Sequence, residues 1–302
     1  MLLYACTIFL SAFLLFEVQP MIGKIILPWF GGSAAVWSTC LLFFQASLLA
    51  GYLYAHCSTR YLKPRGQAIL HVLLMAVSLA LLPILPSPDW KPSQPGDPSG
   101  RILLLLAATI GLPYILLSAT SPLLQAWIVM AKPGAIPYRL FALSNIGSLL
   151  ALCSFPVLVE PLFTNRMQAL GWSGFYAVFV LLCAVVAWRT LRASSIPLLN
   201  GRGSETPMLN RGRKEAVAGE PGLKLQILWA ALAACASAVL LEISNHLSQN
   251  VAPIPFLWAV TLGLYLLSFI ICFEREHAYR RAVFLPLLVL SLSAAAYALY
   301  YN

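Results

Sequence analysis

Residues 15–24 read LFEVQPMIGK, and they lie inside the first long apolar run of the chain. Glutamate, glutamine, proline and lysine all occur within these ten positions, from Glu17 to Lys24. A segment that crosses about 30 Å of hydrocarbon needs about 20 mostly apolar residues, and a charge inside one is costly. The stretch therefore raises two questions: whether this segment crosses a membrane, and why it contains charged residues if it does.

Composition answers the question of fold class. The chain has 302 residues, of which 60% are hydrophobic and 10% are charged, and its mean hydropathy is +0.83. A soluble globular domain is about 45–50% apolar and about 25% charged. The composition therefore indicates an integral membrane protein. Its seven cysteines form neither a C-x-x-C motif nor a Cys/His cluster with metal spacing, so we expect free thiols, no metal site and no cofactor.

Apolar runs long enough to cross a bilayer recur along the whole chain. One further apolar stretch, 121–131, follows Pro122, and we interpret it as a kinked continuation of the fourth run, because a helix bundle tolerates such a break. The sequence thus predicts an all-α polytopic membrane protein with about nine transmembrane helices, at roughly 2–27, 35–57, 67–86, 101–120, 138–160, 172–191, 225–246, 254–273 and 281–300.

Basic residues predict the orientation of these spans. Lysine and arginine gather in alternate loops, 58–66, 132–139, 189–224 and 274–281, while the other loops hold few or pair them with aspartates. Cytoplasmic loops of membrane proteins carry such an excess, so we expect a cytoplasmic N-terminus. The formal net charge of +9 then reflects topology, and we expect the lipid bilayer, not nucleic acid, as the partner.

The chain contains an internal repeat. LFEVQP begins at Leu15 and LLEISN begins at Leu240, and the spans that follow each motif also match, so spans 1–3 recur as spans 7–9 in the same orientation. Parallel six-span halves joined by a long cytoplasmic linker are the plan of major-facilitator-type (MFS) transporters. We expect a first six-helix bundle at 1–192, a basic flexible linker at 193–224 and a partial second bundle of three helices at 225–302.

On that plan the second half is incomplete. Either the chain is a fragment, or another chain supplies the missing C-terminal helices. Assembly of two copies into a homo-oligomer also remains open.

The paired glutamates are the leading candidates for a functional site. Glu17 lies about 22 Å along its helix at 1.5 Å per residue, within the outer half of the bilayer. Glu242 occupies the matching position of span 7, so the two carboxylates are expected to face each other and to suit a cation or a proton. The candidate substrate-binding residues are Glu17, Gln19, Lys24, Glu242, Asn245 and His246. The alternative is structural: packing hydrogen bonds hold each glutamate, and Lys24 extends to the membrane surface.

A second polar cluster surrounds Pro122. Serine and threonine near a membrane proline usually bond the backbone, so we favour a structural role for it. We expect Asn145 to be buried and to bond across helices, and Trp37 to lie in the aromatic belt at the membrane surface. The members of this secondary cluster are Ser118, Thr120, Ser121, Gln125 and Asn145.

Four long motifs carry a resemblance to a known family. They are FEVQPMIGKIILPWFGGSAAVWSTCLLFFQ from Phe16, LSATSPLLQAW from Leu117, YRLFALSNIGSLLAL from Tyr138 and LLEISNHLSQNVAPIPFLW from Leu240. They resemble the membrane half of fused MFS/spermidine-synthase-like bacterial proteins. In that family a cytoplasmic Rossmann-like domain, similar to spermidine synthases that use decarboxylated S-adenosylmethionine, follows the membrane part. The resemblance implies a multi-pass protein of the bacterial inner membrane.

The synthase-like domain itself is not in this sequence. A nucleotide site of that kind needs a glycine-rich turn after a strand, and neither Gly31-Gly32 nor Gly201-Arg202-Gly203 follows one. Nothing forms a nucleophile–base set, so we do not expect an enzyme. Two functions remain: a transporter-like module that handles polyamines or another small cation, or a non-transporting anchor or regulator of a cytoplasmic synthase-like domain on another chain.

Overall fold

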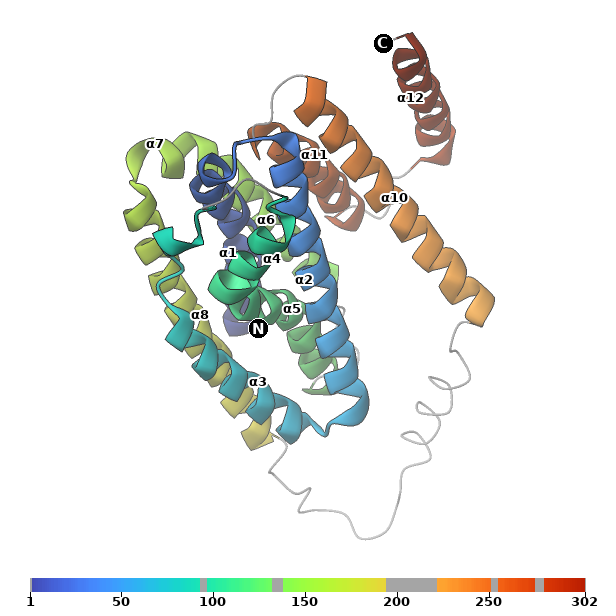
Figure 1. Ribbon diagram of the computed structural model, residues 1–302. Helices are drawn as coiled ribbons and strands as arrows, with labels where there is room; N and C mark the ends of the chain where they lie inside the picture. Colours follow the sequence, from blue (N-terminus) through green and yellow to red (C-terminus); the bar gives the residue numbers. More distant parts are fainter. Residues whose placement is uncertain are drawn as a thin grey trace.

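The computed structural model describes residues 2–92, 97–131, 138–193, 222–250, 255–274 and 280–301, and every regular element in these ranges is a helix (Figure 1). Within these residues, seven helical stretches are long and apolar enough to cross a membrane. The last two helices carry shorter apolar stretches, Ala259–Ile271 and Arg281–Ala294. The prediction of an all-helical chain with several potential membrane spans is therefore confirmed. The predicted linker lies almost entirely outside the described residues.

Helices occupy each predicted span. The part before the linker contains α1 (Leu2–Ile26), η1 (Leu27–Trp29), α2 (Ala34–Tyr61), α3 (Pro64–Ser78), η2 (Leu79–Leu81), η3 (Pro88–Trp90), α4 (Ser99–Leu106), η4 (Ala107–Gly111), α5 (Leu112–Ala131), α6 (Tyr138–Ser154), η5 (Phe155–Val159), α7 (Glu160–Leu162) and α8 (Asn165–Ala193). The part after it contains α10 (Leu223–Asn250), α11 (Pro255–Glu274) and α12 (Arg281–Tyr301).

Prolines inside the spans do not end the helices. Pro20 lies within α1, and Pro122 lies within α5. The stretch after Pro122 continues the fourth span, as predicted, because α4, the π-helical η4 and α5 follow one another without a break. A helix in a bundle can lose one backbone hydrogen bond to proline when neighbouring helices still pack around it.

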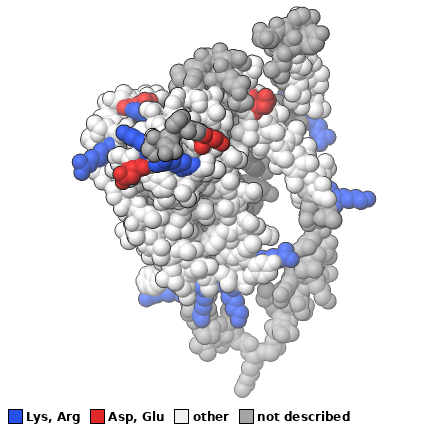
Figure 2. All heavy atoms as spheres, in the orientation of Figure 1, with Lys and Arg blue, Asp and Glu red and all other residues white. Residues whose placement is uncertain are grey.

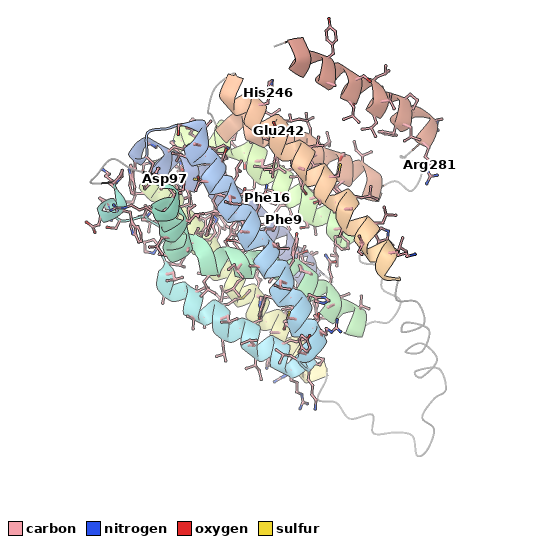
Figure 3. The ribbon with its side chains drawn as sticks, turned by 45° about the vertical axis from the view of Figure 1, so that its right-hand side comes forward. Phe9, Phe16, Asp97, Glu242, His246 and Arg281 are labelled. Atoms are coloured by element: carbon pink, nitrogen blue, oxygen red, sulfur yellow. The ribbon has the colours of Figure 1, made fainter. Side chains whose placement is uncertain are left out.

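Helix α1 packs against several helices of the first bundle. Its main neighbours are α6, α8 and α5, while α2 packs on α5 and α3 packs on α8. Helix α11 joins this bundle by packing on α6, and α10 packs mainly on α11. Helix α12 stands apart from the bundle in both ribbon views (Figures 1 and 3). The densest core of the described residues therefore lies in the part before the linker, around α1, α2, α5 and α8.

The structure contradicts the sequence prediction for Trp37. We expected it in an interfacial belt, yet only 1% of its surface is exposed. A Cβ at Gly23 would lie 2.6 Å from its Cζ3 atom, so the indole fills the space that this glycine leaves on α1. The turn before α2, where Gly31 and Gly32 have φ of +93° and +63°, lets the chain reverse so that the start of α2 meets the end of α1. Trp37 is a core residue.

Candidate membrane-embedded polar site

Glu17 is a carboxylate on α1 without a partner among the described residues. It is partly buried, and the side chains one turn away on either side, Leu14 and Met21, are buried almost completely. No hydrogen bond or ion pair within the described part of the chain reaches its carboxyl oxygens. An ionised group in such surroundings normally finds a counter-charge or a ligand, because its desolvation is otherwise uncompensated.

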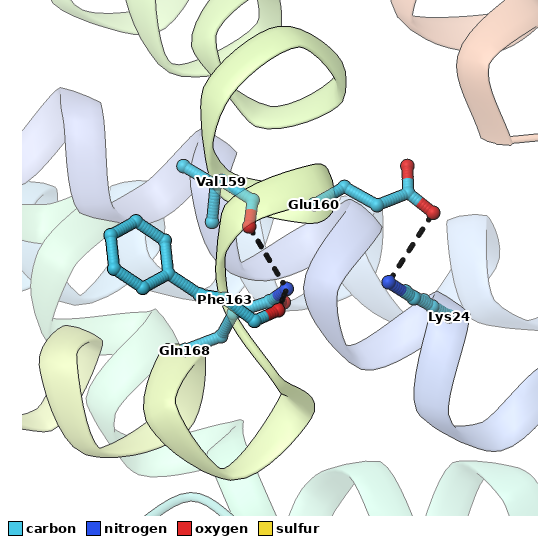
Figure 4. A network of polar contacts seen from close by, with 5 residues as sticks. All are labelled: Lys24, Val159, Glu160, Phe163 and Gln168. Carbon is cyan, nitrogen blue, oxygen red and sulfur yellow. Dashed lines mark hydrogen bonds and ion pairs between the residues drawn. The ribbon is translucent and has the colours of Figure 1, made fainter.

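Lys24 does not supply that counter-charge. Its Nζ lies 3.3 Å from Oε1 of Glu160, the first residue of α7 (Figure 4). The two side chains keep 33% and 46% of their surface exposed, so water screens the pair. The sequence grouped Lys24 with Glu17 because they are seven residues apart on one helix, but the lysine bonds across to another helix. Within the described part of the chain, Glu17 is thereby left without an ionic partner on this face.

The Lys24–Glu160 pair is expected to add little to stability. Exposed ion pairs are worth about 0–1 kcal/mol, so Lys24→Gln should lower the free energy of unfolding by at most about 1 kcal/mol. Unfolding in detergent micelles at low and high salt checks this, and the loss should shrink as salt rises. A loss of several kcal/mol would show that Lys24 carries a structural role beyond this pair.

Gln19 is committed to helix packing. It is buried, and its Nε2 donates to the hydroxyl of Tyr114 on α5 at 3.0 Å and to the carbonyl of Leu15 at 3.3 Å. The first bond joins α1 to α5, and the second joins the side chain to the backbone of α1 itself. The amide nitrogen of Gln19 is therefore occupied within the protein, which favours a structural role for a residue that we had grouped with the substrate site.

The candidates of the second half lie in different surroundings. Glu242 is exposed on α10, and His246 one turn later is partly buried (Figure 3). Ser244 between them is buried, and its hydroxyl lies 3.0 Å from that of Thr261 on α11. The side chain of Asn245 lies outside the described residues. Glu17 and Glu242 thus match in sequence but differ in burial.

The hydrogen bonds of the cluster around Pro122 agree with the structural role that we favoured. Ser118 donates to the carbonyl of Ile115 at 2.8 Å, and Thr120 donates to that of Leu116 at 2.7 Å. Gln125 donates to the Ser121 hydroxyl at 3.1 Å, one turn back on the same helix. These bonds satisfy polar groups within α5.

Asn145 departs from its prediction. It is only partly buried on α6, and the described residues include no hydrogen bond to its side chain. Among the residues that the structure describes, Asn145 therefore does not form the expected bond across helices. Its neighbour Gly147 makes the close contact instead, since a Cβ there would lie 2.8 Å from the backbone oxygen of Phe9 on α1.

The structure adds a buried polar network that we did not predict, centred on His71 of α3. Both ring nitrogens lie 3.3 Å from hydroxyls, Nδ1 from Tyr54 on α2 and Nε2 from Thr120 on α5. Thr120 gives its only proton to Leu116, so it accepts from Nε2–H, and Nδ1 then accepts from Tyr54. For a neutral imidazole the chain of donors is therefore directional, and the tautomer that fits it carries its proton on Nε2.

A second bond lies one turn away on the same face of α3. The indole Nε1 of Trp127 on α5 donates to Oε1 of Gln67 at 2.9 Å, and both side chains are buried. Gln67 and His71 together hold α3 to α5 by polar contacts inside an apolar bundle. Gln67 and His71 are four residues apart within one apolar run, and this spacing could have indicated a polar face on the helix.

The chemical options of these two sites differ. The described residues contain no group of three or more His, Cys, Asp or Glu side chains able to hold a metal. The His71 network has a hydrogen-bond partner at each ring nitrogen, so it is suited to holding helices together. Glu17 has an acceptor carboxylate with no partner among the described residues, so it is suited to a cation or a proton.

No family model matches the sequence, and no curated protein or solved structure is significantly similar to it.

Proposed function

We propose that this chain is a transporter-like membrane module that binds a small cation, such as a polyamine or a proton, at Glu17. One observation carries the proposal: a partly buried carboxylate on α1, among apolar neighbours, has no partner within the described residues. The nearest lysine along the helix is already paired with Glu160. A bound cation supplies the missing positive charge.

The arrangement of helices supports an MFS-like plan for the module. Helix α3 packs on α8, and α6 from the first half packs on α11 from the second. The contact between α6 and α11 joins the six-span bundle to the second part of the chain, which fits two halves related by a parallel repeat. We also propose, from the sequence motifs, that the chain is the membrane part of an MFS/spermidine-synthase-like protein of the bacterial inner membrane, with its N-terminus in the cytoplasm.

Substitution of Glu17 by glutamine tests the carboxylate. The change keeps the shape of the side chain and removes its charge, so uptake of radiolabelled spermidine into proteoliposomes should fall about tenfold or more, since a charged hydrogen bond contributes about 1.5–3 kcal/mol. Potassium and proton uptake are measured in parallel, because the carboxylate suits either. Wild-type-like uptake by the Glu17→Gln protein would overturn the assignment of the site.

Glu242→Gln and Glu160→Gln serve as matched controls. Glu242 is exposed and Glu160 is paired with Lys24, so each variant should keep most of the uptake. If all three variants lose uptake equally, the effect follows from general loss of negative charge. If the wild-type protein moves none of the cations, the non-transporting module becomes the better description.

A further inference from the structure

Five exposed basic side chains gather at one end of the first bundle. They come from the tight α2–α3 hairpin and from the end of α8, and we call them the basic rim: Arg60, Lys63, Arg65, Arg189 and Arg192. The space-filling view shows Lys and Arg atoms of the described residues along this lower end of the bundle (Figure 2). The sequence itself has no Asp or Glu in residues 18–88 or 161–204, which include all five.

The hairpin holds its part of the rim on a fixed backbone. Only Leu62 and Lys63 separate α2 from α3, and the Leu62 amide donates to the Ser58 carbonyl at 3.0 Å. Gln67, itself buried, donates to the Leu62 carbonyl at 2.9 Å. The three cations of the hairpin therefore project from a fastened turn.

The end of α8 is fixed as well. The Arg192 guanidinium lies over the Trp188 ring at 3.9 Å from its centroid, and the hydroxyls of Thr190 and Tyr4 of α1 are 3.3 Å apart. Ala68 of α3 and Ala187 of α8 belong to the same buried cluster, so the two basic ends lie beside each other. Cations held in place in this way lose less entropy when they bind a ligand.

An exposed apolar stripe continues from an arginine on each of the two helices. On α3, exposed apolar side chains follow Arg65 at intervals of four residues. On α8, exposed apolar side chains precede Arg192 at intervals of three or four residues. Residues at these spacings share one face of a helix. The members of the α3 stripe are Ile69, Leu73 and Val77, and those of the α8 stripe are Trp188, Val185 and Leu181, all with at least 41% of their surface exposed.

The length of the stripes matches one leaflet of a bilayer. Twelve residues separate Arg65 from Val77, which is about 18 Å at 1.5 Å per residue, against about 15 Å for half of the hydrocarbon core. Each stripe thus offers a cation at headgroup depth and an apolar surface of acyl-chain length. A free phosphate uses only the first of these features, whereas a phospholipid uses both.

We propose that the α3–α8 face binds an anionic phospholipid, with its phosphate at the basic rim and its acyl chains along the two stripes. Basic clusters next to membrane spans attract anionic headgroups with about 1 kcal/mol for each lysine or arginine, which is about a fivefold change in affinity. The site is separate from Glu17, and it does not depend on the proposed function.

Native mass spectrometry of the whole protein tests this proposal, with phosphatidylglycerol and phosphatidylcholine as probes. The wild-type protein should retain phosphatidylglycerol preferentially. The double variant Arg65→Gln/Arg192→Gln should bind it about 25-fold more weakly, given about fivefold for each of the two residues. Arg101→Gln/Arg166→Gln removes the same charge from segments outside the rim and should keep the preference.

Several outcomes would overturn the proposal. They are equal retention of both lipids by the wild-type protein, an unchanged preference in the rim variant, and an equal loss in the two double variants. Displacement of phosphatidylglycerol by an equal concentration of glycerol phosphate would show that the headgroup alone is the ligand. Unchanged thermal unfolding of the rim variant in zwitterionic detergent confirms that it is folded, and weaker lipid retention by the wild-type protein in high salt tests the electrostatic part without any mutation.

Discussion

Gly51→Ala is expected to destabilise the first bundle, although alanine forms helices better than glycine. Helix α2 approaches α5 at this position so closely that a Cβ would lie 2.6 Å from the backbone oxygen of Ile115 and would overlap the Ser118 hydroxyl. The serine can turn away, but the carbonyl belongs to the α5 backbone and moves only with that helix. Overpacking of this kind costs about 1–3 kcal/mol, which exceeds the gain of up to about 1 kcal/mol in helix propensity.

Gly174→Ala on α8 is the matched control for Gly51→Ala. Gly174 is exposed inside a helix, and a Cβ there meets nothing within 4 Å, so only the propensity gain remains. Thermal unfolding in detergent should therefore move in opposite directions for the two variants. Adding Ser118→Gly to Gly51→Ala should restore only part of the loss, because the Ile115 carbonyl stays in place. If Gly51→Ala proves as stable as Gly174→Ala, the close packing of α2 on α5 is wrong.

Hydropathy predicted the helices of this fold well, because a span must be long, apolar and internally hydrogen-bonded. The spans at 35–57 and 172–191 correspond to α2 at 34–61 and α8 at 165–193, with the helices extending beyond the apolar runs. The prediction for Trp37 failed because an aromatic residue at a span end suits a lipid interface and a helix contact equally well. The decisive feature is Gly23 on another helix, which becomes a neighbour only after folding.

The candidate site was predicted in part. Glu17 stood out in the sequence because one carboxylate in an apolar run is unusual, and its surroundings agree with that interpretation. The partner of Lys24 was missed, because Glu160 is distant in the chain and reaches Lys24 through the packing of α1 beside α6 and η5. Spacing along one helix predicts which residues share a face, but it does not identify which other helix lies opposite that face.

The His71 network was also missed. A single histidine in an apolar run looks unremarkable, and its partners Tyr54 and Thr120 come from two other helices. Yet Gln67, His71 and Ser78 recur at intervals of four and seven residues, and all three are buried. Polar residues that recur along one face of an apolar helix indicate hydrogen bonds between helices, but their spacing does not identify the partners on the other helices.

His71→Leu is expected to lower the free energy of unfolding by about 1–3 kcal/mol, since each interhelical hydrogen bond in a membrane protein contributes about 0.6 kcal/mol and up to about 1.7. The substitution removes both ring bonds and leaves the Tyr54 hydroxyl without its acceptor. Thr120 keeps its bond to Leu116, so its hydroxyl stays paired, while α3 loses one bond to α2 and one to α5. Unfolding of the whole protein in mixed detergent measures the loss.

His56→Leu and a double-mutant cycle separate the network from a general effect of losing histidine. His56 is exposed on α2, so the same substitution there should change stability by no more than about 0.5 kcal/mol. Tyr54→Phe removes only the first bond of the chain, and it should have a much smaller effect when His71 is already leucine. Full additivity of Tyr54→Phe and His71→Leu would contradict the bond between them. Coupling between the two changes would instead establish the bond between Tyr54 on α2 and His71 on α3, so that these two helices hold together through a polar contact that surrounding lipid cannot replace.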